Sequence, residues 1–322
     1  MNIKTVLTGL ILVGVHTSVA ALDDRTNLQP STRMSATMSA PQPMLDYAAM
    51  PELNAQSVLV FDQASGQALM AKNAALQTPI ASITKLMTAI VVLDAGQPLD
   101  ERITISSDDL DTLKGTGSRL AIGSSYTRGQ LLHLALIASD NRAAHALGRT
   151  TQGGLDRFVA NMNRMARALH MTNTVYVEPT GLSSDNVSTA LDLAKLVDYA
   201  YQNYPEIRHI STTGNYTLGT QRVVLKKKRQ QQVQYRQVAF NNTNRFTRAD
   251  DWHVGLSKTG FINEAGHCLV MQVQVADRDV IIVLLDAQGT SRRAGDAALI
   301  KRWLESAQPH ESDSRFIPVS RT

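Results

Sequence analysis

The stretch Pro79-Ile80-Ala81-Ser82-Ile83-Thr84-Lys85-Leu86-Met87-Thr88 decides the fold. An apolar pattern of helical period begins directly after the proline, which favours the start of a helix there. Ser82 lies in the expected first turn. Lys85 follows three residues later, so the two side chains share one face of the helix. At this spacing the lysine amine can reach the serine hydroxyl.

The pair of Ser82 and Lys85 has the chemistry of a nucleophile and its base. A serine hydroxyl is a weak nucleophile until a base accepts its proton, and lysine can accept it only if burial or a nearby cation lowers its pKa. The apolar residues around Lys85 predict burial, and the helix N-terminus favours negative charge near Ser82. Taken alone, however, a Ser-x-x-Lys pattern is more often an exposed helix start with a solvated lysine.

A second polar group, Ser139-Asp140-Asn141, follows the amphipathic run 131–138. Thr127 and Gln130 form a capping box for the helix expected over that run. The trio therefore predicts a hydroxyl and an amide on a short connection beside the core, where Ser139 could relay a proton and Asn141 could hold a substrate amide. Taken alone, the trio is more often a turn capped by Ser and Asn.

The third group, Lys258-Thr259-Gly260, lies in the strand-like stretch 254–262. Lysine and threonine on a strand can bind a carboxylate, and glycine removes a side chain that would block the approach of substrate. This tripeptide is also common by itself. The three groups together occur in order on an expected helix start, inter-helix turn and C-terminal strand, so the sequence predicts a serine enzyme.

The motif trio resembles that of the penicillin-recognising serine enzymes. The resemblance includes 117–120, 179–182 and 188–190. It extends over about 55–307 and is greatest for low-molecular-mass penicillin-binding proteins of the D-alanyl-D-alanine endopeptidase type. It implies that Ser82 attacks a D-alanyl carbonyl of peptidoglycan with Lys85 as general base. Ser139 and Asn141 would assist proton transfer and position the substrate.

The resemblance also implies a binding role for the C-terminal strand. Lys258 and Thr259 would hold the carboxylate of the peptide or of a β-lactam, and Gly260 would leave room for it. The backbone N–H groups of Ser82 and Phe261 would form the oxyanion hole. Peptidoglycan cross-links are then the expected substrate, and β-lactam antibiotics the expected covalent inhibitors.

The periodicity predicts an α/β (α+β) fold. Strand-like runs occur near both ends of the chain, and helical periods lie between them. We expect one antiparallel sheet built from both chain ends, with a mostly helical middle docked on it. The expected strands are 56–61, 67–72, 252–262, 268–276 and 280–286, and the main expected helices are 84–95, 130–138, 155–169, 190–201 and 293–305.

The chain ends have the composition of targeting and linker segments. A positive start, an apolar run over 5–15 and small residues up to Ala21 predict a cleavable signal peptide over 1–21, hence a periplasmic protein without a stable membrane anchor. An uncleaved anchor helix is the alternative, although the run is short for a bilayer. Residues 22–54 are expected to form a flexible tether, 55–307 the catalytic domain and 308–322 a disordered tail.

The overall composition permits a packed domain without disulfides. The 322 residues are 43% hydrophobic, and the single cysteine, Cys268, lies among apolar neighbours and is expected to be buried. The eight histidines lack metal-ligand spacing, so neither a metal nor another cofactor is expected. The net charge of +4 is too small to identify a partner.

The basic run Lys226-Lys227-Lys228-Arg229 raises a different class of function, a module that binds an anionic cell-wall polymer. Such a run is more often a strand edge or a hairpin tip. It has no interleaved aromatic residues, and the predicted export disfavours nucleic acid as a partner.

Two further enzyme classes compete with the endopeptidase. A class A β-lactamase carries a deacylating glutamate followed by a leucine–asparagine pair, whereas Glu178 precedes Pro179-Thr180-Gly181, so Glu178 is expected to be structural. Anchored D-alanyl-D-alanine carboxypeptidases often have a further β-rich domain. Two strands, one helix and a tail account for the segment after Gly260, so it has no room for such a domain. This favours the endopeptidase over the anchored carboxypeptidase.

Overall fold

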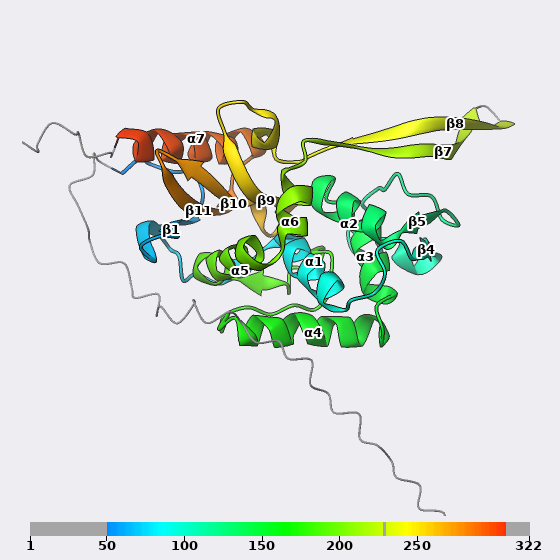
Figure 1. Cartoon of the computed structure of the whole chain (residues 1–322), viewed down its shortest axis with the longest axis horizontal. Coiled ribbons are helices and arrows are strands. Elements are labelled where there is room, and N and C mark those ends of the chain that lie inside the picture. Colours follow the sequence, from blue (N-terminus) through cyan, green and yellow to red (C-terminus); the bar gives the residue numbers. More distant parts are fainter. Residues whose placement is uncertain (1–49, 228–229, 307–322) are drawn as a thin grey trace, which may run out of the picture.

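The computed structural model describes residues 50–227 and 230–306, and within them the side chains of 220–236 are not described. Its central element is a five-stranded antiparallel sheet in the order β2-β1-β11-β10-β9. The expected sheet from both ends of the chain is thereby confirmed, since β1 pairs directly with β11 (Figure 1). The strands are β1 (Ser57–Asp62), β2 (Gln67–Lys72), β9 (His253–Ile262), β10 (Gly266–Val275) and β11 (Arg278–Ala287).

Helices cover both faces of this sheet. The C-terminal helix α7 packs on one face, and α5 packs on the other, with the remaining helices beyond it (Figure 1). One of them, α6, was not expected from the sequence, although a proline at its first turn is typical of a helix start. The helices are α1 (Thr84–Asp94), α2 (Arg128–Ile137), α3 (Asn141–Arg149), α4 (Gly154–Ala168), α5 (Ala190–Asn203), α6 (Pro205–Thr212) and α7 (Thr290–Ser306).

The apolar runs of the central strands are explained by burial on both faces. Successive side chains of a strand point to opposite faces. On β11, Val280, Ile282 and Leu284 belong to the core under α7. The residues between them, such as Ile281 and Val283, belong to the larger core shared with the helical part. Both sets are fully buried, so a strand in this position needs apolar residues without alternation.

A long two-stranded hairpin extends from the helical part. It consists of β7 (Asn215–Lys227) and β8 (Gln230–Asn241), which pair with each other in a separate sheet and project from the body (Figure 1). Lys226 and Lys227 of the basic run end β7, and its other two residues lie outside the described part of the chain. Shorter pairs are β3 (Thr78–Pro79) with β6 (Val187–Ser188), and β4 (Arg102–Thr104) with β5 (Ser125–Thr127).

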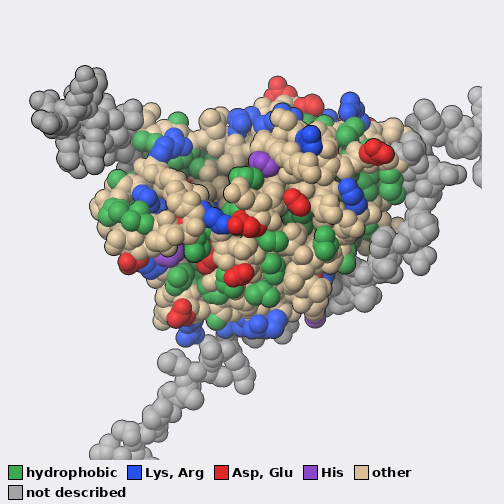
Figure 2. All heavy atoms as spheres, turned by 180° about the vertical axis from the view of Figure 1, so that it is seen from behind, with side chains coloured by type: hydrophobic (Ala, Val, Ile, Leu, Met, Phe, Trp, Pro, Cys, Tyr) green, Lys and Arg blue, Asp and Glu red, His purple; other side chains and the backbone are tan. Residues whose placement is uncertain are grey.

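The predicted signal peptide, most of the tether and the tail lie outside the described residues, so the domain boundaries remain predictions. Within 50–227 and 230–306, no helix has both the length and the apolar character needed to cross a membrane. On the face seen in Figure 2, acidic and basic side chains are interspersed among apolar ones.

Candidate active site

Ser82 lies at the junction between the sheet and the helices. It is in a single 3₁₀ turn, Ala81–Ile83, that runs directly into α1. The helix α1 therefore begins slightly later than the sequence pattern predicts, with Ser82 in the turn before it. Ala81 has a φ of +47°, a conformation that costs free energy for a residue with a Cβ. Such strain is common at functional sites, and here it sets the direction of the Ser82 backbone.

Lys85 is completely buried and is held by three hydrogen bonds. Its Nζ atom lies 2.8 Å from Ser82 Oγ, 2.7 Å from Asn141 Oδ1 and 2.6 Å from the carbonyl oxygen of Thr180. The spacing of three residues therefore places the amine on the hydroxyl, as the sequence predicted. Two of its partners, the amide oxygen and the carbonyl oxygen, can only accept hydrogen bonds. Ser82 is the one partner here that can also donate.

Burial lowers the pKa of Lys85 from 10.5 to about 8. Burial penalises the charged ammonium because it removes the hydrating water. The negative charges of Glu178, Asp140 and Asp111 act against this shift. The amine is consequently neutral in a useful fraction of molecules near neutral pH, which is the requirement for a general base.

Ser139 and Lys258 face each other across the site. Ser139 is in the turn between α2 and α3 with a φ of +56°. The buried Lys258 donates from Nζ to Ser139 Oγ at 2.9 Å and to the carbonyl oxygen of Thr259 at 2.8 Å. Burial lowers the pKa of Lys258 well below its usual value, and the positive charges of Lys85 and Arg293 lower it further. A carboxylate bound here would offset these costs.

The strand β9 brings its motif alongside the nucleophile. Lys258 and Gly260 are two residues apart and therefore lie on the same face of the strand. A Cβ on Gly260 would lie only 3.1 Å from the backbone nitrogen of Ser82, so glycine leaves space beside that N–H. The Oγ1 of Thr259 donates to Thr243 Oγ1 at 2.6 Å. The side chain of Phe261 is 52% exposed and stacks on His267.

The structure thus gathers all the predicted site residues, although the Phe261 side chain points outward. Several groups that contact them or act on their charge are not marked by the sequence pattern. The Thr180 carbonyl is one, and its stretch 179–182 had been noticed only as part of a resemblance. Arg293, from α7, donates to the Cys268 carbonyl at 3.1 Å and adds positive charge near Lys258. In the sequence Arg293 is marked only as the start of an expected helix.

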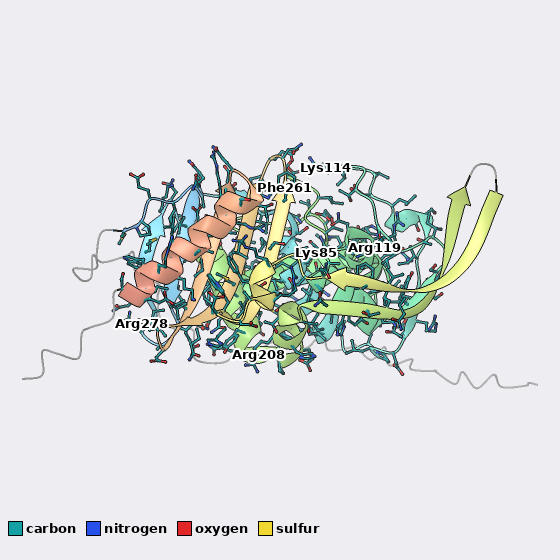
Figure 3. The ribbon with its side chains drawn as sticks, turned by 90° about the horizontal axis from the view of Figure 1, so that it is seen from above. Lys85, Lys114, Arg119, Arg208, Phe261 and Arg278 are labelled. Atoms are coloured by element: carbon teal, nitrogen blue, oxygen red, sulfur yellow. The ribbon has the colours of Figure 1, made fainter. Side chains whose placement is uncertain are left out.

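A loop between the 3₁₀ turn Ser107–Asp109 and β5 borders the site. Thr116 Oγ1 accepts a hydrogen bond from Asn141 Nδ2 at 2.9 Å. Lys114 forms an ion pair with Glu264, in the turn between β9 and β10, so the loop reaches from the helical part to the sheet. Figure 3 shows Lys114 and Phe261 at the same rim, with Lys85 nearer the centre.

Glu178 is bound by its own turn. Its carboxylate accepts hydrogen bonds from the backbone N–H groups of Thr180, Gly181 and Ser183 and from the side chain of Asn186. These contacts fix the turn whose Thr180 carbonyl holds Lys85. The carboxylate therefore acts on the turn, in agreement with the structural role expected for it.

Other potential reactive centres are inert by their surroundings. Cys268 is buried, and burial raises the pKa of its thiol to about 12, so the thiolate is rare at neutral pH. Among the residues that the structure describes, no group of three or more His, Cys, Asp or Glu side chains is placed to hold a metal ion.

The comparisons with known proteins agree with this geometry. The peptidase S11 family, described as D-alanyl-D-alanine carboxypeptidase, matches residues 44–289. A D-alanyl-D-alanine endopeptidase of Pseudomonas aeruginosa is 43% identical over 283 residues, which are 85% of this chain and 84% of that protein.

Solved structures show the same fold. The Streptomyces K15 DD-transpeptidase superposes with a TM-score of 0.70 at 27% identity, covering 80% of this chain and 99% of that one. Penicillin-binding protein D2 of Listeria monocytogenes, in its cefotaxime-bound form, superposes with a TM-score of 0.66 at 26% identity, covering 82% of this chain and 99% of that one. The site has a buried lysine, Lys85, beside a serine before a helix, and a second lysine, Lys258, on the edge strand β9. Together with the family match over most of the chain, this shows that the chain belongs to the peptidase S11 family.

Proposed function

We propose that this protein is a periplasmic serine D-alanyl-D-alanine endopeptidase that hydrolyses the peptide cross-links of peptidoglycan. The observation that carries the proposal is the set of three hydrogen bonds that hold Lys85 Nζ. Two of its partners accept only, so the lone pair of the neutral amine has Ser82 as its available hydrogen-bond donor. The identity to the Pseudomonas endopeptidase supports the choice of reaction.

The reaction follows from these positions. Ser82 Oγ forms a bond to the D-alanyl carbonyl carbon while its proton passes to Lys85 Nζ. The backbone N–H groups of Ser82 and Phe261 stabilise the negative charge on the carbonyl oxygen. In such sites each donor lowers the barrier by about 3 to 4 kcal/mol. The C–N bond then breaks, and the leaving amine takes a proton relayed through Ser139.

Hydrolysis of the acyl-enzyme completes the cycle. Water attacks the ester carbonyl, the peptide leaves as a carboxylic acid, and Ser82 recovers its proton. Lys258 and Thr259 hold a carboxylate of the substrate. The same attack by Ser82 on the carbonyl of a β-lactam opens the ring and leaves an acyl group on the serine. The Listeria protein of the same fold has been solved in a cefotaxime-bound form.

The test uses a fluorescent penicillin and intact-mass spectrometry. The protein is expected to gain one penicillin mass, and the Ser82→Ala variant none. Absence of an adduct, under conditions that label a control enzyme, contradicts the proposal. A β-lactamase would instead release the drug rapidly, and a cell-wall-binding module would be unaffected by Ser82→Ala.

The second test separates the endopeptidase from a carboxypeptidase. Defined cross-linked and uncross-linked muropeptides are digested side by side. We expect cross-linked dimers to be converted to monomers faster than terminal D-alanine is released from monomers. The opposite order assigns the protein as a carboxypeptidase, an activity borne by other relatives.

A further inference from the structure

The Asn141 side chain has two different ends, and each has one partner. Its Oδ1 accepts from Lys85 Nζ at 2.7 Å, and its Nδ2 donates to Thr116 Oγ1 at 2.9 Å. The amide ends are nearly identical in shape but opposite in hydrogen-bonding character. Rotation of the amide by half a turn would therefore present N–H groups to Lys85. The partner at Thr116 decides which end faces the base.

Asp111 fixes the direction of the Thr116 hydroxyl. Thr116 donates to Asp111 Oδ2 through its hydroxyl at 2.6 Å and through its backbone N–H at 2.8 Å. A hydroxyl has a single proton, so Thr116 Oγ1 has only lone pairs left for Asn141. An ionised carboxylate cannot reverse this direction because it accepts only.

The carboxylate of Asp111 is kept ionised by its own loop. Partial burial raises its pKa, but hydrogen bonds from the Thr116 hydroxyl and from the backbone N–H groups of Lys114, Thr116 and Leu113 outweigh this and lower it. The ion pair between Lys114 and Glu264 attaches the same loop to the turn after β9. Asp111 is therefore a fixed acceptor at one end of a short chain of hydrogen bonds.

The other end of this chain is the lone pair of Lys85. A neutral amine has two N–H groups and one lone pair. When Asn141 Oδ1 and the Thr180 carbonyl both accept, the two N–H groups are used and the lone pair points to Ser82. A reversed Asn141 amide would donate to that lone pair and compete with the Ser82 hydroxyl for it.

We propose that Asp111 and Thr116 are positioning residues that hold the Asn141 amide in the orientation that directs the Lys85 lone pair at Ser82. This inference rests on the proposed roles of Ser82 and Lys85. It adds a chain of hydrogen bonds, Asp111–Thr116–Asn141–Lys85–Ser82. The Asp111 carboxylate can only accept, and this fixes which atom donates in each of the following hydrogen bonds. Neither Asp111 nor Thr116 touches the reacting atoms.

The first test compares variants of one loop. Thr116→Val keeps the shape and removes the hydroxyl, and Thr116→Ser keeps the hydroxyl. Thr112→Val makes the same chemical change at an exposed threonine of the same loop, for which the described residues provide no side-chain hydrogen bond. The readout is the second-order rate constant for acylation by a fluorescent penicillin across the pH range, with melting temperature as a check on folding.

We expect Thr116→Val to lower the limiting acylation rate constant at least about tenfold, which is part of the ~10²–10⁴-fold that a general base contributes. Thr116→Ser and Thr112→Val should acylate like the natural protein. Asp111→Asn should lower the limiting rate too, because its new N–H groups let Thr116 reverse. It should also move the acidic limb to lower pH, because it removes one of the three negative charges that raise the pKa of Lys85 and leaves only those of Glu178 and Asp140.

A double-variant cycle separates positioning from a general structural role. In an Asn141→Ala background there is no amide to orient, so adding Thr116→Val should change the acylation rate little further. A full additional loss there overturns the proposal, as does a Thr116→Val protein with the same limiting rate as Thr112→Val. If the natural protein itself is not acylated, the proposed function fails instead, so the two failures are distinct.

Discussion

Gly181 lies directly against the carbonyl of Ala81, so closely that a Cβ on Gly181 would be 1.9 Å from that oxygen. Gly181 also has a φ of +82°, which favours glycine. The turn that holds Lys85 through the Thr180 carbonyl is thus packed on the strained backbone before Ser82. Glycine is required here by both space and conformation.

We expect Gly181→Ala to destabilise the protein by about 2 kcal/mol or more and to abolish most acylation, because the backbone before Ser82 must move. The matched control is Gly295→Ala, in the middle of α7, where a Cβ meets no atom within 4 Å. That change should raise stability by about 0.5–1 kcal/mol, because alanine is the better helix former. Chemical denaturation measures both, and equal stability of the two variants contradicts the prediction.

Acylation should depend on pH through Lys85. The base acts in its neutral form, and the pKa of Lys85 is lowered to about 8. The rate constant should therefore rise with pH through a midpoint at about 8 and fall tenfold per pH unit on the acidic side. Lys85→Arg should lose acylation, because the guanidinium is always protonated. A rate constant that is constant across roughly pH 6 to 9 would rule out this lysine as the base.

Glu178→Gln distinguishes a structural glutamate from a deacylating one. The glutamine nitrogen cannot accept from the turn's N–H groups, so we expect lower stability, by about 1–3 kcal/mol, and slower acylation. Loss of the negative charge should also lower the pKa of Lys85, which moves the acidic limb to lower pH. Stopped-flow acylation and the lifetime of the acyl-enzyme are measured together. A much longer lifetime with unchanged acylation identifies Glu178 as the deacylating base after all.

Asp296 attaches the start of the domain to α7. It is fully buried, and its carboxylate accepts from the backbone N–H groups of Asn54 and Ala55 and from the Asn54 side chain. Asp296→Ala leaves the buried N–H of Ala55 without an acceptor and should cost about 2 kcal/mol, with little direct effect on Ser82 chemistry. Asp251→Ala, which removes an exposed ion pair with Lys301, should change the melting temperature little. Similar shifts for both variants would refute the distinction.

The sequence predicted those parts of the molecule that repeat a local pattern. The strands β10 and β11 contain long runs of apolar residues, and the three motifs have fixed spacings, so both can be located from the sequence. Thr180 contributes a backbone oxygen, which residue identity does not encode. Thr116 and Asp111 lie in a polar loop without periodicity, and they reach Asn141 only through the tertiary fold.

The hairpin of β7 and β8 shows a different limit. Its strands are rich in polar residues, such as the glutamines around Gln231, and pair only with each other. A strand is recognised in a sequence mainly by the apolar residues of its buried face. A hairpin that projects from the body buries little, so its sequence lacks this apolar pattern. Only its basic end was anticipated.

The pairing of β1 with β11 has a consequence for the order in which the protein can form. During synthesis β1 is made early, yet its partner is completed more than two hundred positions later, after the whole helical part. Until then β1 has apolar residues on both faces and an unpaired edge. Contacts this distant in sequence form slowly, because a long loop must be closed first. We therefore expect nascent chains that stop before β11 to remain unfolded and open to proteases, and the molecule to acquire its nucleophile only as one of its last folding events.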